Sequence, residues 1–141
     1  MSIITVVNLK GEECDQSEFI RYIAESVWFP TALLPNEFLN WEPIDSETAR
    51  VIVNYRGGNL SFLFYFNAEG QITKLTTEDR FMEEKGELKK EKWSCYCRKY
   101  KEINNVRIPT EGEVEWNLPD KNISYAKLRI IDIEYNKTSK Y

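Results

Sequence analysis

The spacing of apolar side chains changes once along the chain, from a helical period to the period of a β-strand. Between Asp15 and Trp28 apolar positions recur every three or four residues, as on the buried face of an amphipathic helix. Asp15 is placed to cap the first turn, and Glu18, three positions later, can reach back to it. We therefore expect a helix over residues 15–28, preceded by a short β-branched strand at residues 3–7.

From Phe38 onward the period is two, which is typical of strands that bury one face. Polar turns such as residues 56–59 and 104–105 separate the apolar runs. Residues 60–66 are nearly all apolar, so we expect this strand at the centre of the sheet with both faces covered. The mixed-charge residues 83–92 suit a solvated loop or the tip of a long hairpin. The predicted strands begin at Trp41 and then occupy residues 50–55, 60–66, 71–82, 93–100, 106–118 and 123–135.

This order of elements predicts an α+β fold. A curved antiparallel sheet of about seven strands, connected as a meander, would pack on one N-terminal amphipathic helix and form a half-barrel-like structure. The chain contains no internal repeat and no shift of composition, so residues 1–141 are expected to form a single domain.

Charge and composition set several classes of function aside. The net charge is −4, and basic residues are scattered among acidic ones, so we expect no nucleic-acid partner. No apolar run approaches the ~18 residues that a membrane span needs. The first residues lack the features of a secretory signal, which predicts a cytoplasmic protein.

The absence of histidine removes imidazole-assisted nucleophilic catalysis and imidazole metal ligands. Cys95 and Cys97 point to one face of a predicted strand, but with Cys14 as the only other thiol they favour buried packing over a metal site. Acidic residues at positions 111, 113 and 115 likewise share a face and suit a solvated strand surface. We therefore predict a non-enzymatic protein without a cofactor or a metal.

Four stretches of the chain, residues 24–35, 41–45, 106–116 and 131–136, resemble a bacterial family of uncharacterised proteins, a domain of unknown function. Members of that family extend further at the N-terminus, so the resemblance implies that this chain is the C-terminal part of a longer protein, which leaves its localisation open. The late strands also resemble lipoprotein-carrier (LolA-like) half-barrels. This second resemblance implies an apolar cavity between sheet and helix.

We interpret the chain as a binding domain for an apolar or amphipathic molecule, such as a lipid, held in a cleft between sheet and helix. For Glu25 two readings stay open: it faces solvent, or it turns inward to Arg50 or Arg80. The alternative function is a structural or protein-interaction module in which the aromatic residues only fill a core and an edge strand pairs with a partner. The candidate ligand-binding residues are Glu25, Trp28, Trp41, Phe64, Tyr65, Arg80 and Trp116.

Overall fold

The computed structural model describes residues 11–134, and the strand predicted at residues 3–7 lies outside them. One α-helix is followed by two short 3₁₀ turns and a meander of seven strands. The elements are α2 (Glu12–Glu25), η1 (Ser26–Trp28), η2 (Pro30–Leu33), β1 (Leu39–Pro43), β2 (Thr48–Tyr55), β3 (Gly58–Phe66), β4 (Ile72–Glu84), β5 (Glu87–Ile103), β6 (Val106–Asn117) and β7 (Asn122–Arg129).

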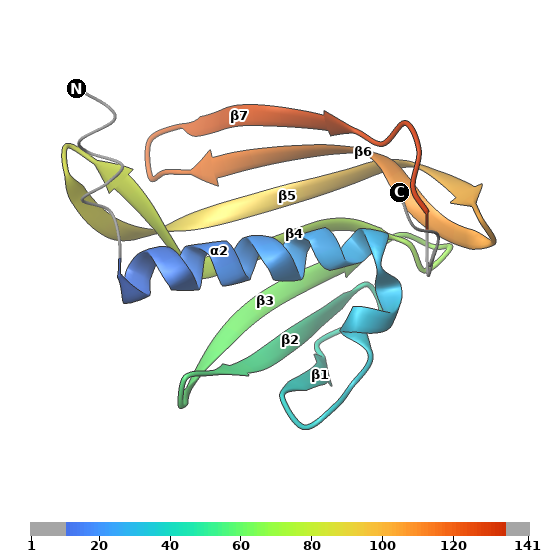
Figure 1. Cartoon of the computed structure of the whole chain (residues 1–141), viewed down its shortest axis with the longest axis horizontal. Helices are drawn as coiled ribbons and strands as arrows, with labels where there is room; N and C mark the ends of the chain where they lie inside the picture. Colours follow the sequence, from blue (N-terminus) through green and yellow to red (C-terminus); the bar gives the residue numbers. More distant parts are fainter. Residues whose placement is uncertain (1–10, 135–141) are drawn as a thin grey trace, which may run out of the picture.

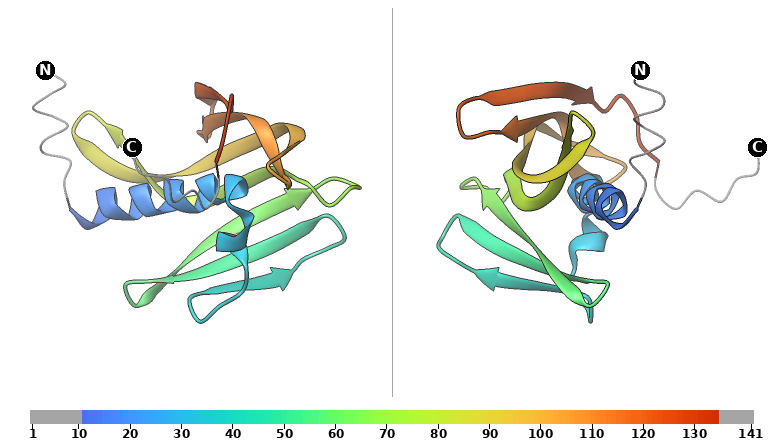
Figure 2. Two further views of the ribbon diagram at one scale, coloured as in Figure 1. Left: turned by 45° about the vertical axis from the view of Figure 1, so that its right-hand side comes forward. Right: turned by 90° about the vertical axis from the view of Figure 1, so that its left-hand side faces the viewer.

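Every strand pairs antiparallel with the next one, so the order across the sheet is the order in the sequence. Figure 1 shows α2 lying along β4, with β3, β2 and β1 on one side of it and β5, β6 and β7 on the other. Seen nearly along the helix axis in Figure 2, the sheet curves around α2 and stays open. The predicted α+β meander with a curved sheet is confirmed.

Helix α2 starts earlier than its capping pattern predicts. Gly11 occupies the N-cap position without a side-chain hydrogen bond, so the prediction that Asp15 caps the helix is wrong. Asp15 lies in the first turn, where the positive end of the helix dipole stabilises its negative charge. Its carboxylate also pairs with Arg56 at 3.1 Å. The α-helix ends at Glu25, and the residues up to Trp28 continue it as a 3₁₀ turn.

Three strand connections are tight two-residue turns with positive φ at both central positions, which suits the right-handed twist of hairpins. Arg56 and Gly57 form the first, with φ of 49° and 79°. Lys85 and Gly86 form the second, so the charged segment around them is the predicted tip of a long hairpin. The predicted turn at residues 104–105 is the third, with φ of 50° and 67°.

Two strands differ from their predicted form. Strand β3 is third of seven rather than central, and full burial is confined to Leu60, Phe62 and Phe64 on the face toward α2. Its apolar run is longer than one face requires because Leu63 and Tyr65 on the opposite face are half-buried by neighbouring strands. The last strand ends at Arg129, before the predicted residue 135, because pairing with β6 ends there.

The core lies between α2 and the concave face of the sheet. Ile20, Ile23, Ala24 and Val27 are buried and follow the predicted helical spacing. They pack with the inward residues of the strands into one cluster, which extends across the sheet to Val114. Within residues 11–134, no helix has the length and apolar character needed to cross a bilayer.

Candidate functional site

A cavity of about 350 Å³ lies between the C-terminal half of α2 with η1 and the part of the sheet formed by β4 to β7. Its volume is at the lower end of the roughly 300–1,000 Å³ typical of small-molecule sites. The lining is mostly apolar. Its principal residues are Ala24, Glu25, Val27, Trp28, Arg80, Trp93, Cys95, Cys97, Gly112, Val114, Tyr125, Ala126 and Leu128.

Small side chains at three facing positions leave this space open. Ala24 of α2 faces Gly112 of β6 and Ala126 of β7 across the cavity wall. A Cβ at Gly112 would make only ordinary contacts, 3.5 Å from the Tyr96 carbonyl oxygen and 3.9 Å from Leu128 Cβ, so the missing side chain matters for the space it leaves. No large side chain from these positions reaches between sheet and helix.

An irregularity in β4 places Arg80 in the cavity. The register of β4 against β5 shifts between Thr77 and Arg80, and β3 pairs with β4 only as far as Thr76, so the main-chain groups that β4 presents beyond it need other partners. Helix α2 supplies them: Gln16 Nε2 donates to the Asp79 carbonyl at 2.7 Å, and Ser17 Oγ accepts from the Phe81 amide at 3.0 Å. The helix and the bulge therefore hold each other in place beside Arg80.

Asp79 itself is turned away from the cavity toward β3. Its Oδ2 accepts a hydrogen bond from the Ser61 amide at 2.8 Å, and its Oδ1 pairs with Lys90 at 3.7 Å. Thr77 Oγ1 donates to the Ser61 carbonyl at 2.8 Å and accepts from the Asp79 amide at 3.1 Å. Side chains thus replace the regular β3–β4 hydrogen bonds at the bulge, leaving Arg80 to face the β5–β7 side.

The guanidinium of Arg80 is stacked on two indole rings. Its Cζ lies 4.5 Å from the Trp93 ring centroid and 5.4 Å from that of Trp116. Arg80 Nη1 donates to Tyr125 Oη at 3.1 Å, and the same oxygen accepts from Trp93 Nε1 at 2.8 Å. Arg80 Nε is buried without a hydrogen-bond partner within the described chain.

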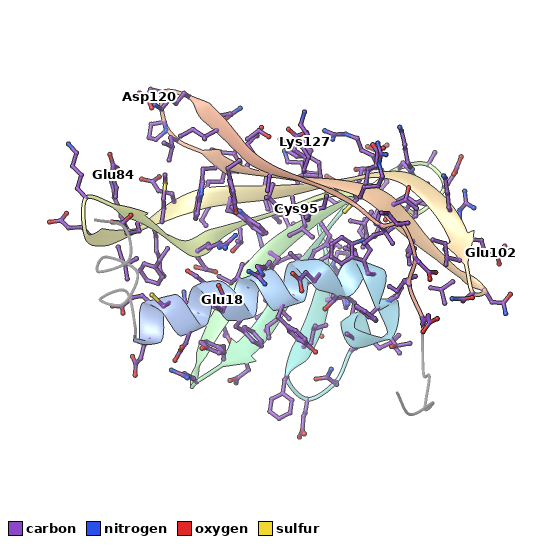
Figure 3. The ribbon with its side chains drawn as sticks, turned by 45° about the horizontal axis from the view of Figure 1, so that its top comes forward. Glu18, Glu84, Cys95, Glu102, Asp120 and Lys127 are labelled. Carbon is purple, nitrogen blue, oxygen red and sulfur yellow. The ribbon has the colours of Figure 1, made fainter. Side chains whose placement is uncertain are left out.

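Cys95 and Cys97 face the cavity from β5, as their spacing predicts, and both are buried. Their thiols share a hydrogen bond, which lowers the pKa of Cys95 and raises that of Cys97. Burial opposes the first shift, while the positive charge of Arg80 adds to it. Cys95 is therefore the thiol of this pair that ionises first, and Figure 3 labels it near the middle of the molecule.

Glu25 lies at the rim, with its side chain 45% exposed, and pairs with Arg21 one helical turn earlier at 3.3 Å. The interpretation in which it turns inward to Arg50 or Arg80 is wrong, because the i,i+4 spacing brings Arg21 within reach first. Tyr125 and Leu128 of β7 form the opposite rim, exposed by 47% and 43%. The mouth of the cavity is thus charged on the helix side and apolar on the strand side.

The acidic residues of β6 serve the outer face of the sheet, and each has a partner. Glu113 accepts from Ser124 and Arg98, and these bonds, that of Ser124 first, lower its pKa. A hydrogen bond from Lys99, 3.0 Å away, lowers the pKa of Glu111. Tyr96 Oη donates to Glu115. These contacts fit the predicted solvated strand face.

The structure brings together only part of the predicted ligand-binding set. Glu25, Trp28 and Arg80 line the cavity, and Trp116 borders it through its contact with Arg80. Trp28 Nε1 donates to the Pro109 carbonyl at 3.1 Å, which fixes η1 over β6. Figure 3 shows that the hairpin tips, marked by the labelled Glu84, Glu102 and Asp120, lie far from the labelled cavity residue Cys95.

Trp41, Phe64 and Tyr65 lie elsewhere. Trp41 packs edge-on against fully buried Phe64, with ring centroids 5.1 Å apart, in the part of the core covered by β1 to β3. Tyr65 points to the outer face, where Lys74 lies over its ring. None of the three is among the residues that line the cavity, because β1 to β3 pack against the opposite flank of α2.

The sequence interpretation missed Trp93 and Tyr125 as residues of this site. Trp93 is only 1% exposed and starts the alternating Trp93, Cys95, Cys97 series, which places all three on one face. That signal was present in the sequence. Tyr125 instead reaches the cavity through a register shift between β6 and β7, which alternation alone does not reveal.

Within residues 11–134, no three His, Cys, Asp or Glu side chains come together in a way that could hold a metal ion.

The family model of DUF6544, a family of unknown function, matches residues 1–128. The chain belongs to the DUF6544 family. The cavity-lining residues of this DUF6544 member all lie within the matched part. The searches of curated proteins and of solved structures gave no significant match. Membership in a family of uncharacterised proteins is thus confirmed, and the likeness to lipoprotein carriers stays a prediction.

Proposed function

We propose that this DUF6544 member binds a small amphipathic molecule in the cavity between α2 and strands β4 to β7, and that it does so without catalysis. The observation that carries the proposal is a 350 Å³ cavity whose wall combines apolar side chains with one stacked arginine. Apolar walls with a few placed polar groups are the usual form of a small-molecule site.

The size and the rim of the cavity restrict the kind of molecule that fits. Its volume suits a single short chain and is too small for a two-chain phospholipid. Exposed Tyr125 and Leu128 offer apolar contacts at the entrance, and Arg21 and Glu25 offer polar ones. A molecule with an apolar body and one polar group matches both features.

Native mass spectrometry of the purified chain, followed by organic extraction, tests whether a small molecule travels with the protein. Delipidated protein is then titrated with octan-1-ol and octanoate, followed by NMR. We expect saturable binding to the wild type and its loss in Ala126→Phe, whose ring fills the cavity. Ala68→Phe, the same change in an exposed turn, is the matched control and should bind as the wild type does. No saturable uptake by folded wild type would contradict the proposal.

A further inference from the structure

We propose that Arg80 is the receptor for an anionic head group, so that the ligand is a small amphiphile carrying a single carboxylate. The inference rests on the proposed function, since it assigns the polar end of the molecule whose apolar part occupies the cavity. It is carried by the contacts of Arg80 and by the way the surrounding acidic groups are paired.

No acidic side chain of the described residues neutralises the charge of Arg80. Within residues 11–134 no carboxylate lies within 4.0 Å of its guanidinium in an ion pair, although acidic residues are close in sequence and across the strand. Asp79 pairs with Lys90, and Glu91, the cross-strand neighbour of Arg80, pairs with Lys89 at 3.6 Å. An arginine that lines a largely apolar cavity without an acidic partner favours an anion supplied from outside.

The acidic residues around the cavity are also engaged by other cations. Glu25 pairs with Arg21 at the rim, and Glu111 pairs with Lys99 on the outer face of the sheet. These pairs leave Arg80 as the one unpaired charge of the described cavity wall, so a dianionic group such as a phosphate would be only half neutralised there. A monoanion is the better match, and a carboxylate fits the planar guanidinium.

Two hydrogen-bond donors of this site, Arg80 Nε and the hydroxyl of Tyr125, have no acceptor within the described residues. Arg80 Nε has no acceptor within residues 11–134, and a buried charged donor without an acceptor is costly. Tyr125 Oη already accepts from Arg80 Nη1 and Trp93 Nε1, so both of its lone pairs are used. Toward a ligand this hydroxyl can therefore act only as a hydrogen-bond donor. A carboxylate that reaches the guanidinium beside its Nη1–Tyr125 contact can accept hydrogen bonds from Arg80 and from the Tyr125 hydroxyl.

The two indole rings hold the guanidinium plane before any ligand arrives. Trp93 and Trp116 contact it at 4.5 and 5.4 Å, and the hydroxyl of Tyr125 fixes its outer edge. A pre-positioned receptor loses little conformational freedom on binding, which favours affinity. Beyond this polar end, Val27, Val114 and Leu128 provide an apolar wall for the rest of the molecule.

The experiment compares octanoate with octan-1-ol at neutral pH, where the acid is ionised, by calorimetry on the full chain. In the wild type we expect octanoate to bind about tenfold to a hundredfold more tightly than the alcohol, as charge-assisted hydrogen bonds imply. Arg80→Gln should remove this preference by weakening octanoate binding far more than octan-1-ol binding. Arg80→Lys should restore part of it, and Tyr125→Phe should reduce it several-fold.

Arg56→Gln is the matched control, because Arg56 also stacks on an aromatic ring and pairs with Asp15, but outside the cavity. It should keep the preference for octanoate. Equal binding of acid and alcohol by the wild type, or an unchanged preference in folded Arg80→Gln, overturns the inference and leaves the proposed function standing. Binding of neither probe by the wild type overturns both. The wild-type comparison decides the case even if Arg80→Gln does not fold.

Discussion

The two sides of the sheet meet the same helix in different ways. On the side of β1 to β3, large inward side chains such as Phe62 and Phe64 are fully buried and fill the space against α2. On the side of β5 to β7, the inward positions near the end of α2 include Gly112 and Ala126, and a cavity remains. One side of the fold is built for packing, while the other leaves a space with an arginine in its wall.

The difference shows that apolar character alone does not identify a site in this fold. Trp41 and Phe64 are aromatic and face the helix, yet they contact each other in the core. Trp93 and Trp116 are aromatic as well, yet they stack on a guanidinium at the cavity. What separates the two sides is the size of the facing residues and the bulge that turns Arg80 inward.

The largest effect is expected from truncating the filled side. Phe64→Ala should lower the free energy of unfolding by about 3–5 kcal/mol, because it removes a fully buried ring and leaves a new void. Val114→Ala borders an existing cavity, so its cost should be near ~1.5 kcal/mol, the transfer of two methyl-sized groups. Denaturant unfolding measures both, and equal costs after correction for side-chain size would contradict the comparison.

The contact that joins α2 to the β4 bulge should come next. Ser17→Ala should cost about 1–3 kcal/mol, because the Phe81 amide loses its acceptor in a part-buried position. Since the bulge positions Arg80, the variant should also weaken octanoate binding more than octan-1-ol binding. Ser46→Ala, in an exposed bend, is the control. Unchanged stability in Ser17→Ala would show that the helix does not hold the bulge.

Larger side chains should change the stability in opposite directions on the two sides of the sheet. Val51→Phe overpacks a residue with no exposed surface and should destabilise the protein by about 1–3 kcal/mol. Ala126→Leu adds volume where the cavity already offers it and should be neutral or stabilising by up to ~1 kcal/mol. Thermal unfolding of the two variants gives the comparison. A clear loss of stability in Ala126→Leu would mean that the cavity cannot take up a side chain.

The cavity thiols should differ in reactivity without a change in stability. In a Cys14→Ala background, a small alkylating reagent should modify Cys95 before Cys97, because the thiolate reacts and the pKa of Cys95 is lowered while that of Cys97 is raised. The rate at Cys95 should therefore rise with pH at lower values than for an ordinary thiol. Peptide mapping locates the label, and octanoate should slow the reaction. Preferential labelling of Cys97 would contradict the assignment.

Much of the fold was predictable because it depends on local spacing. The helical period places Ile20, Ile23 and Val27 on one buried face, and residues with positive φ form the turns around Gly57 and Gly86. The start of the helix was not predictable from Asp15, because Gly11 takes the cap position and Asp15 pairs with Arg56. Capping patterns describe only the local options, whereas Asp15 pairs with an arginine 41 positions along the chain.

The order of elements, the faces of the strands and the absence of imidazole chemistry all follow from residue type and near-neighbour spacing. Which inward residues border a space depends on how the helix and the strands pack together. That outcome depends on three small residues from α2, β6 and β7 that line the same space, and on a bulge in β4 held by side chains of α2. These contacts join residues far apart in the chain, so no local pattern contains them.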